Sequence, residues 1–138
     1  MKPVNILSYK YNPKAKYGCF IQLVIDDIPL IDLLESAIPE EAEYRNWHEK
    51  REALLVKENL FATIDESGNK DILTCAGCRR PDDIYLDGCV IEHDGDFITW
   101  EMHPPGYEIF FDKAETIKLK FHKPQYEKVV KEIMEIKQ

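Results

Sequence analysis

The amino-acid sequence predicts a single α+β domain, in which an antiparallel β-sheet of hairpins carries two or three helices packed at its edges and ends in a C-terminal helix. Short runs of alternating apolar and polar residues, separated by turn residues, predict the strands. A few segments have apolar residues at helical spacing, but predicted strands and helices do not alternate regularly along the chain. This order favours an antiparallel sheet over a doubly wound parallel sheet. A chain of 138 residues with 44% hydrophobic content can bury one core, so we expect one domain over residues 1–138.

The first third of the chain predicts a hairpin and a helix. Residues 6–11 and 17–26 are rich in aromatic and β-branched side chains, and turn residues lie between them. Asp26 and Asp27 are expected to end the second strand. Residues 30–34 then place three leucines at helical spacing behind a proline suited to a first helical turn, which predicts a short amphipathic helix.

The middle of the chain is more polar. Residues 39–55 carry acids first and bases later, the order that the helix dipole prefers, and predict a second helix or a lid over the sheet. Residues 60–65 and 71–75 are short apolar stretches joined by Ser-Gly-Asn at 67–69. This pattern predicts another hairpin.

The second half contains the clearest pattern. Residues 84–93 and 97–103 flank Asp-Gly-Asp at 94–96, the strongest local signal for a β-hairpin. Residues 116–122 alternate apolar side chains with lysines, which indicates a half-exposed strand. Behind Lys123 and Pro124, a final helix is predicted by a single apolar stripe, made of Tyr126, Val129, Val130, Ile133 and Met134.

The charge balance restricts the classes of partner. The chain has 18 Lys and Arg against 26 Asp and Glu, a net charge of -8. Such a surface repels phosphate backbones, so free nucleic acid is not expected as a ligand. No apolar run approaches the roughly 20 residues of a membrane span, and no signal peptide is evident. We therefore expect a cytoplasmic protein with reduced cysteines and no membrane partner.

The sharpest candidate for a metal site is formed by cysteines. Cys75 and Cys78 have C-x-x-C spacing, and Cys89, with His93 or His103, would complete a tetrahedral zinc shell. The same pair is an alternative candidate for thiol chemistry. A third interpretation is that these thiols pack as small hydrophobic side chains. A small zinc- or thiol-dependent protein therefore remains an alternative.

Catalytic signatures are absent from the sequence. It contains no G-x-S-x-G nucleophile elbow, no phosphate-binding loop and no dinucleotide-binding glycine motif. His48 and His93 are isolated candidates for acid–base groups, but a lone histidine at a surface position is usually only solvated. We therefore expect a protein that acts by binding and not as an enzyme.

Acidic residues are segregated along the chain. Residues 17–44 and 81–112 contain no Lys or Arg, while Asp and Glu accumulate there beside aromatic residues. Charge steers encounters and aromatic side chains anchor complexes, so this pattern predicts a surface for a basic protein partner. A solvated acidic surface and a self-associating structural subunit are the alternatives. The predicted partner-binding residues are Asp82, Asp83, Tyr85, Asp87, Asp94, Asp96, Tyr44 and Trp47.

Four segments carry a resemblance to a known family. They are Ile-Asp-Asp-Ile-Pro-Leu at 25–30, the cysteine turn at 75–78, Ile-Thr-Trp at 98–100, and Phe-Phe-Asp at 110–112 or Phe121 with Tyr126. In this order they resemble a family of small bacterial proteins with no established reaction. Asp27 stands where that family has glycine, the cysteine spacing differs, and the stretch from 78 to 100 is longer. The resemblance implies no enzymatic activity and suggests, by analogy, an immunity-type inhibitor that covers a basic toxin.

Overall fold

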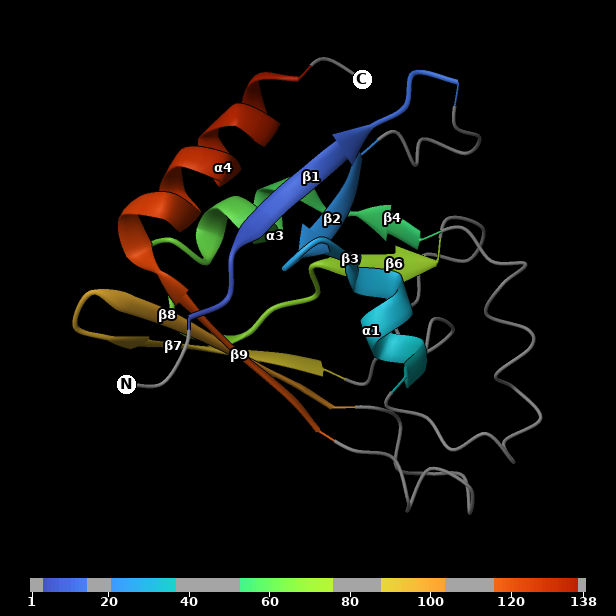
Figure 1. Cartoon of the computed structure of the whole chain (residues 1–138). Coiled ribbons are helices and arrows are strands. Elements are labelled where there is room, and N and C mark those ends of the chain that lie inside the picture. Colours follow the sequence, from blue (N-terminus) through green and yellow to red (C-terminus); the bar gives the residue numbers. More distant parts are fainter. Residues whose placement is uncertain (1–3, 15–20, 37–52, 76–87, 104–115, 137–138) are drawn as a thin grey trace.

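The α+β class is confirmed by a computed structural model, which describes residues 4–14, 21–36, 53–75, 88–103 and 116–136 (Figure 1). The described strands form three antiparallel sheets. The three-stranded sheet has the order β1 (Leu7–Tyr11), β2 (Ile21–Ile25) and β3 (Ile28–Pro29), and the two-stranded sheet pairs β4 (Ala53–Leu55) with β6 (Leu73–Cys75). The four-stranded sheet has the order β5 (Gly68–Asn69), β7 (Gly88–Asp94), β8 (Phe97–His103) and β9 (Ile117–His122). The described helices are α1 (Leu30–Ser36), α3 (Lys57–Ala62) and α4 (Lys123–Glu135).

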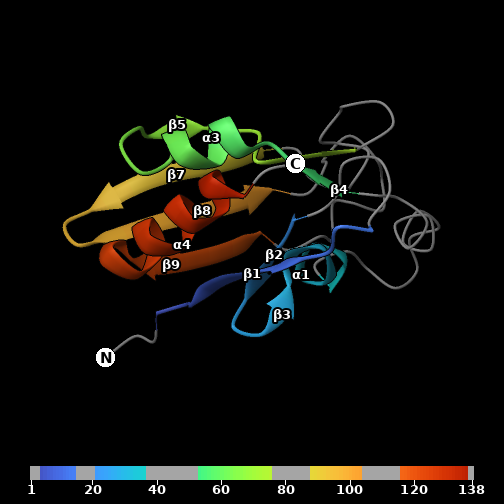
Figure 2. The ribbon, with the colours of Figure 1, turned by 90° about the horizontal axis from the view of Figure 1, so that it is seen from above.

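The helices α3 and α4 lie side by side over one face of the four-stranded sheet (Figure 2). The three-stranded sheet stands beside α4, and β1 contacts this helix directly. No described helix or strand covers the other face of the four-stranded sheet (Figure 1). This second face, which no described element covers, is called the open face below.

The hairpin predicted around Asp94-Gly95-Asp96 is confirmed. Asp94 pairs with Phe97, so Gly95 and Asp96 form a two-residue loop. Gly95 has φ 59°, and Asp96 is not among the residues with positive φ. This combination defines a type II′ turn, whose twist suits the flanking strands.

The prediction for Asp26 and Asp27 was incomplete. They end β2, but they also form a two-residue turn into β3, in which Ile25 pairs with Ile28. Both aspartates have positive φ, 51° and 68°. A type I′ turn requires positive φ at both central residues, and aspartate tolerates that region better than most side chains. Two adjacent aspartates therefore form a hairpin turn without glycine.

The hairpin predicted over residues 60–75 was wrong. Residues 57–62 form α3, which buries Leu60 in the core, and Ile64 just beyond the helix is buried as well. The turn residues Gly68 and Asn69 instead form a strand that pairs with β7. The helix predicted over 39–55 lies outside the described residues up to 52, and residues 53–55 form strand β4.

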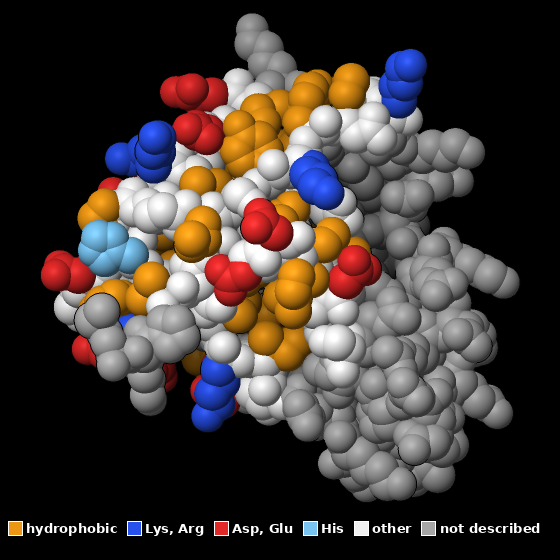
Figure 3. Space-filling model, in the orientation of Figure 1, with side chains coloured by type: hydrophobic (Ala, Val, Ile, Leu, Met, Phe, Trp, Pro, Cys, Tyr) orange, Lys and Arg blue, Asp and Glu red, His pale blue; other side chains and the backbone are white. Residues whose placement is uncertain are grey.

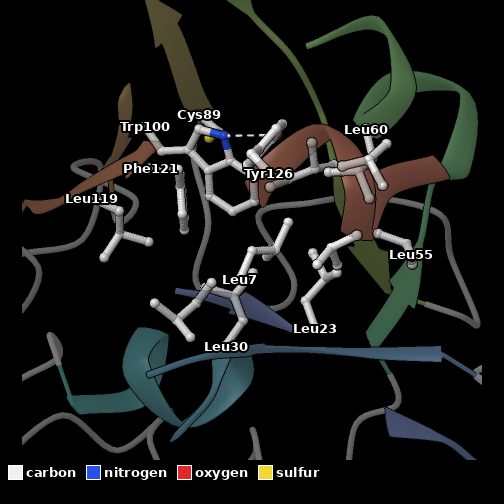
Figure 4. Packing of buried hydrophobic residues seen from close by; sticks show 14 of the residues in the cluster. Leu7, Leu23, Leu30, Leu55, Leu60, Cys89, Trp100, Leu119, Phe121 and Tyr126 are labelled. Atoms are coloured by element: carbon white, nitrogen blue, oxygen red, sulfur yellow. Dashed lines mark hydrogen bonds between the residues drawn. The ribbon is translucent and has the colours of Figure 1, made fainter. Parts of the chain in front are cut away.

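Three aromatic rings form the centre of the core (Figure 4). Trp100, Phe121 and Tyr126 are each at most 1% exposed. The ring centroids of Trp100 and Phe121 are 5.0 Å apart with edge-to-face geometry, and Phe121 and Tyr126 are 5.2 Å apart. Such pairs add about 0.5–1.5 kcal/mol each beyond simple burial. Together the rings join β8 and β9 to α4.

A chain of hydrogen bonds runs through this core. The Trp100 Nε1–H donates to the Tyr126 hydroxyl over 3.2 Å, and the Tyr126 and Thr63 hydroxyls are bonded to each other. Thr63 Oγ1 donates to the Leu60 carbonyl over 2.6 Å. An indole can only donate and a carbonyl can only accept, so each proton has one place in the chain. The polar side-chain groups of Trp100, Tyr126 and Thr63 are thereby all hydrogen-bonded, and these bonds fix α3 and α4 on the sheet.

We expect Tyr126→Phe to lower the free energy of unfolding by about 1–3 kcal/mol, because the buried Trp100 N–H would lose its acceptor. Chemical denaturation measures the effect. Tyr11→Phe, at a side chain that is 48% exposed, is the matched control and should change stability very little. Equal effects of the two substitutions would contradict the proposed importance of the hydrogen bonds made by Tyr126.

Asn5 joins the two larger sheets. Its backbone N–H donates to the Lys120 carbonyl over 2.6 Å, and its side-chain Oδ1 accepts from the Lys120 N–H over 2.8 Å. Its Nδ2 donates to Asp26 Oδ2 over 2.6 Å, while Asp26 Oδ1 accepts from the Ile6 N–H over 2.8 Å. Both oxygens of the Asp26 carboxylate are therefore used inside the fold.

Gln125 protects the edge of β1. Its side-chain Oε1 accepts from the Leu7 N–H over 3.3 Å, and its Nε2 donates to the Leu7 carbonyl over 2.7 Å. The amide thus pairs with both backbone groups of Leu7, as a neighbouring strand would. This arrangement satisfies one residue of an edge that would otherwise be open to strand addition.

The same substitution at the two turn aspartates should have opposite effects. Asp27→Gly removes the cost of positive φ and should raise the free energy of unfolding by about 0.5–1 kcal/mol. Asp26→Gly gains the same relief but loses the bonds to Asn5 and Ile6, which should destabilise the protein by about 1–2 kcal/mol. Thermal denaturation of both variants tests this, and equal signs would contradict the assignment.

Candidate functional site on the open face of the four-stranded sheet

The open face of the four-stranded sheet contains a hollow of about 370 Å³. Alternate residues of a strand point to opposite faces. Cys89, Ile91, Ile98 and Trp100 are buried on the helix side, so their neighbours form the open face. The hollow is lined by Asn5, Val90, Glu92, Thr99, Trp100, Glu101, Lys118, Leu119 and Lys120.

The strand register arranges the charges of this face in rows. Glu92 of β7 lies opposite Thr99 of β8, and Thr99 lies opposite Lys120 of β9. Two residues further along β8, Glu101 lies opposite Lys118 of β9. The face therefore carries carboxylates on β7 and β8 and ammonium groups on β9, with a hydroxyl midway between Glu92 and Lys120.

Contacts at the edge of the hollow position Lys120. Its Nζ lies 4.2 Å from the centroid of the Phe97 ring, a cation–π contact. The Phe97 ring also contacts the His122 ring, with centroids 5.9 Å apart. Asn5 forms hydrogen bonds with both the backbone N–H and the backbone carbonyl of Lys120. This lysine is therefore held more firmly than an ordinary surface lysine.

The β7–β8 hairpin presents a pair of carboxylates at one end of the open face. Asp94 and Asp96 are exposed, and within the described part of the chain no basic side chain lies at ion-pair distance from them. The loop is fixed from behind, because the Lys123 N–H donates to the Asp96 carbonyl over 2.7 Å. The acidic tip is thus held on a short turn tied to the start of α4.

The structure places two of the predicted partner-binding residues, Asp94 and Asp96, at this tip. The others lie outside the described residues: Tyr44, Trp47, Asp82, Asp83, Tyr85 and Asp87. Whether those residues join the tip in one surface stays a prediction.

The cysteines of the predicted metal site fall in different situations. Cys89 is free and fully buried in the apolar core, and burial raises the pKa of its thiol from 9.0 to about 12. A thiolate, the form that binds zinc and acts as a nucleophile, is disfavoured there. The backbone of Cys75 lies in β6, while Cys78 lies outside the described residues. The metal site therefore stays a prediction for which Cys89, as placed, is a poor ligand.

His93, a candidate for acid–base chemistry, has a structural contact. Its Nε2 lies 2.8 Å from the Thr63 carbonyl, which can only accept, so Nε2 carries the hydrogen. This bond holds the C-terminal end of α3 against β7. Among the described residues, no three His, Cys, Asp or Glu side chains are grouped so as to hold a metal ion.

The acidic side chains of the described residues do not form one uniform patch on the face seen in Figure 3. On the face seen in Figure 3, acidic and basic side chains lie among apolar ones. Asp26, in one of the two segments without bases, uses its carboxylate to hold Asn5 and Ile6. The alternation of Lys118 and Lys120 with buried Leu119 and Phe121 predicted the exposed lysines, but the sequence did not show that they share a face with Glu92 and Glu101.

Comparisons with known proteins provide no relative. No protein-family model, no curated protein and no solved structure matches this chain. Within the described segments, no helix is both long and apolar enough to cross a membrane. Function is therefore inferred from the chain's own residues and geometry.

The buried Cys89 thiol predicts a loss of stability at alkaline pH. Below pH 9 both the folded and the unfolded chain keep this proton; above pH 9 the unfolded chain loses it first, so stability falls as pH rises toward 12. Between pH 9 and 10 we expect a loss of about 1 kcal/mol from this group. Urea titrations at both pH values measure it.

Cys89→Ala provides the control for this pH effect. The variant lacks a buried methyl-sized group and should be less stable at pH 7. Its further loss between pH 9 and 10 should be smaller than that of the unmodified chain by about 1 kcal/mol. Parallel pH dependences of the two proteins would show that Cys89 does not titrate as its burial predicts.

Proposed function

We propose that this protein is a non-catalytic protein-binding module of the cytoplasm, which presents an acidic surface to a basic protein partner. Asp94 and Asp96 at the tip of the β7–β8 hairpin form the described part of that surface. The observation that carries the proposal is a pair of exposed carboxylates on a hairpin loop tied to α4. A preorganised loop loses little freedom on binding, so its charges are used efficiently.

The electrostatics of the tip support a basic partner. Within the described chain the carboxylates have no basic group at ion-pair distance, and the net charge of -8 extends a negative field around them. Opposite charges increase the rate of encounter and select against wrong partners. A partner with clustered lysines or arginines is therefore favoured.

The resemblance to small bacterial proteins makes this proposal more specific. An immunity-type inhibitor covers the basic active site of a toxin, and a hairpin with two terminal carboxylates has the charge for such a site. This assignment rests on analogy and on charge, and the same surface suits any basic protein of complementary shape.

The experiment compares Asp94→Lys/Asp96→Lys with the unmodified chain. A partner captured from the source cell by immobilised protein is identified and then titrated by calorimetry against both forms. We expect the double variant to bind at least tenfold more weakly, and its association rate to lose most of its salt dependence. A partner that binds both forms equally would overturn the role of the hairpin tip.

A matched control separates this local effect from net charge. Glu132→Lys/Glu135→Lys changes the total charge by the same amount at two exposed positions of α4. The affinity of this control should stay within about threefold of that of the unmodified chain, because salt screens exposed charges that lie far from the interface. Similar losses in both double variants would show that only the total charge matters.

A further inference from the structure

We propose that the open face of the four-stranded sheet pairs with the same face of a second copy of this chain. The contact would be made by Glu92, Thr99 and Lys120 of each copy. It is independent of the proposed function, which uses the hairpin carboxylates, because none of these three residues belongs to the tip.

The register of the sheet carries this proposal. Glu92, Thr99 and Lys120 lie in one row across three adjacent strands, with Thr99 at the centre. Neighbouring strands are about 4.8 Å apart, so the opposite charges lie at equal distances on either side of β8. The row is antisymmetric about β8.

Such a row is complementary to itself in one orientation. A two-fold axis that lies in the interface along β8 exchanges the two sides of the sheet. It places Glu92 of each copy over Lys120 of the other copy and keeps the strands aligned, as face-to-face sheets commonly pack. A two-fold axis across the strands would instead place Glu92 over Glu92. For the row of Glu92, Thr99 and Lys120 the register therefore favours one symmetric pairing, and Glu101, which lies on β8 itself, faces Glu101 of the other copy in that pairing.

The charge balance of the face also favours a second copy. The hollow is lined by two carboxylates, Glu92 and Glu101, and two ammonium groups, Lys118 and Lys120. Their sum is zero in a chain whose net charge is -8. Two such chains repel each other through their net charge, so a face whose lining charges sum to zero is where they approach at least cost.

The depth and composition of the face allow close packing. Val90 and Thr99 are half-buried, whereas Glu92 and Lys118 are exposed. Packed sheets lie about 10 Å apart, a distance that long side chains from both faces fill. The projecting side chains of one copy would enter the 370 Å³ hollow of the other.

The experiment exchanges the charges of the row. Sedimentation equilibrium of the full chain over a concentration series should show a dimer for the unmodified protein. Glu92→Lys alone and Lys120→Glu alone each place like charges together, and each should weaken the dimer at least tenfold. The double variant E92K/K120E reverses the row, so its dimer should return to within about threefold of the unmodified one.

Mixing the two single variants gives a second test of complementarity. One then has two acids in the row and the other has two bases, so a heterodimer should form where neither variant dimerises alone. Thermal denaturation confirms that each variant is folded. Lys120→Gln, which removes the charge without reversing it, should give an intermediate loss. Lys128→Glu on α4, at an exposed position away from the face, is the control and should leave the dimer unchanged.

Each outcome decides the proposal. A monomeric unmodified chain overturns it, as does a dimer that neither single variant weakens. Weakening without recovery in the double variant or in the mixture also overturns it, because the pairing then does not depend on opposed charges. Recovery in both supports it, whether or not the hairpin tip binds a basic partner.

Discussion

The hydrogen-bonded chain from Trp100 through Tyr126 and Thr63 to the Leu60 carbonyl is the constraint on which the described structure depends. It crosses from β8 to α4 and then to the end of α3. Because buried polar groups are costly unless they are paired, the two helices have one position at which all these groups are satisfied. That position is on one face of the four-stranded sheet, and no helix or strand in the described part of the chain covers the other face.

A second set of bonds fixes the border of that open face. Asn5 joins β9 to the turn between β2 and β3, through Lys120 on one side and Asp26 on the other. The two larger sheets would otherwise meet through apolar contacts, which specify direction poorly. Lys120 therefore belongs both to the junction of the sheets and to the charged row. A change in the position of Asn5 would be transmitted to the charged row through the Lys120 backbone.

Much of the fold could be predicted from the sequence, because its signals are local. The Asp-Gly-Asp hairpin, the alternating strand at 117–122 and the amphipathic α4 need only neighbouring residues to be recognised. The error at 57–75 has the opposite cause. Gly68 and Asn69 have turn chemistry, but they pair with β7, about twenty residues away, and this contact has no signature in the local sequence.

The candidate surface was only partly predictable for a similar reason. Counting charges along the chain identified Asp94 and Asp96, which are exposed, but it also counted Asp26, whose carboxylate is used internally. The opposition of Glu92 and Lys120 exists only in the register of three strands. Cys89 shows the converse, since a C-x-x-C motif nearby suggested a ligand where the core needed a small apolar side chain.

The two surfaces have a geometric consequence if they operate together. A two-fold axis along β8 leaves the strand direction unchanged, so both hairpin tips of the dimer lie at the same end. The carboxylates of Asp94 and Asp96 would then be present twice on one side, and a basic partner with two binding patches would gain avidity without any new contact. Dimerisation through the neutral face would therefore place two copies of the acidic tip on one side of the dimer. The spacing of the two tips would be set by the separation of the packed sheets, so the dimer would select partners by the distance between their basic patches as well as by their charge.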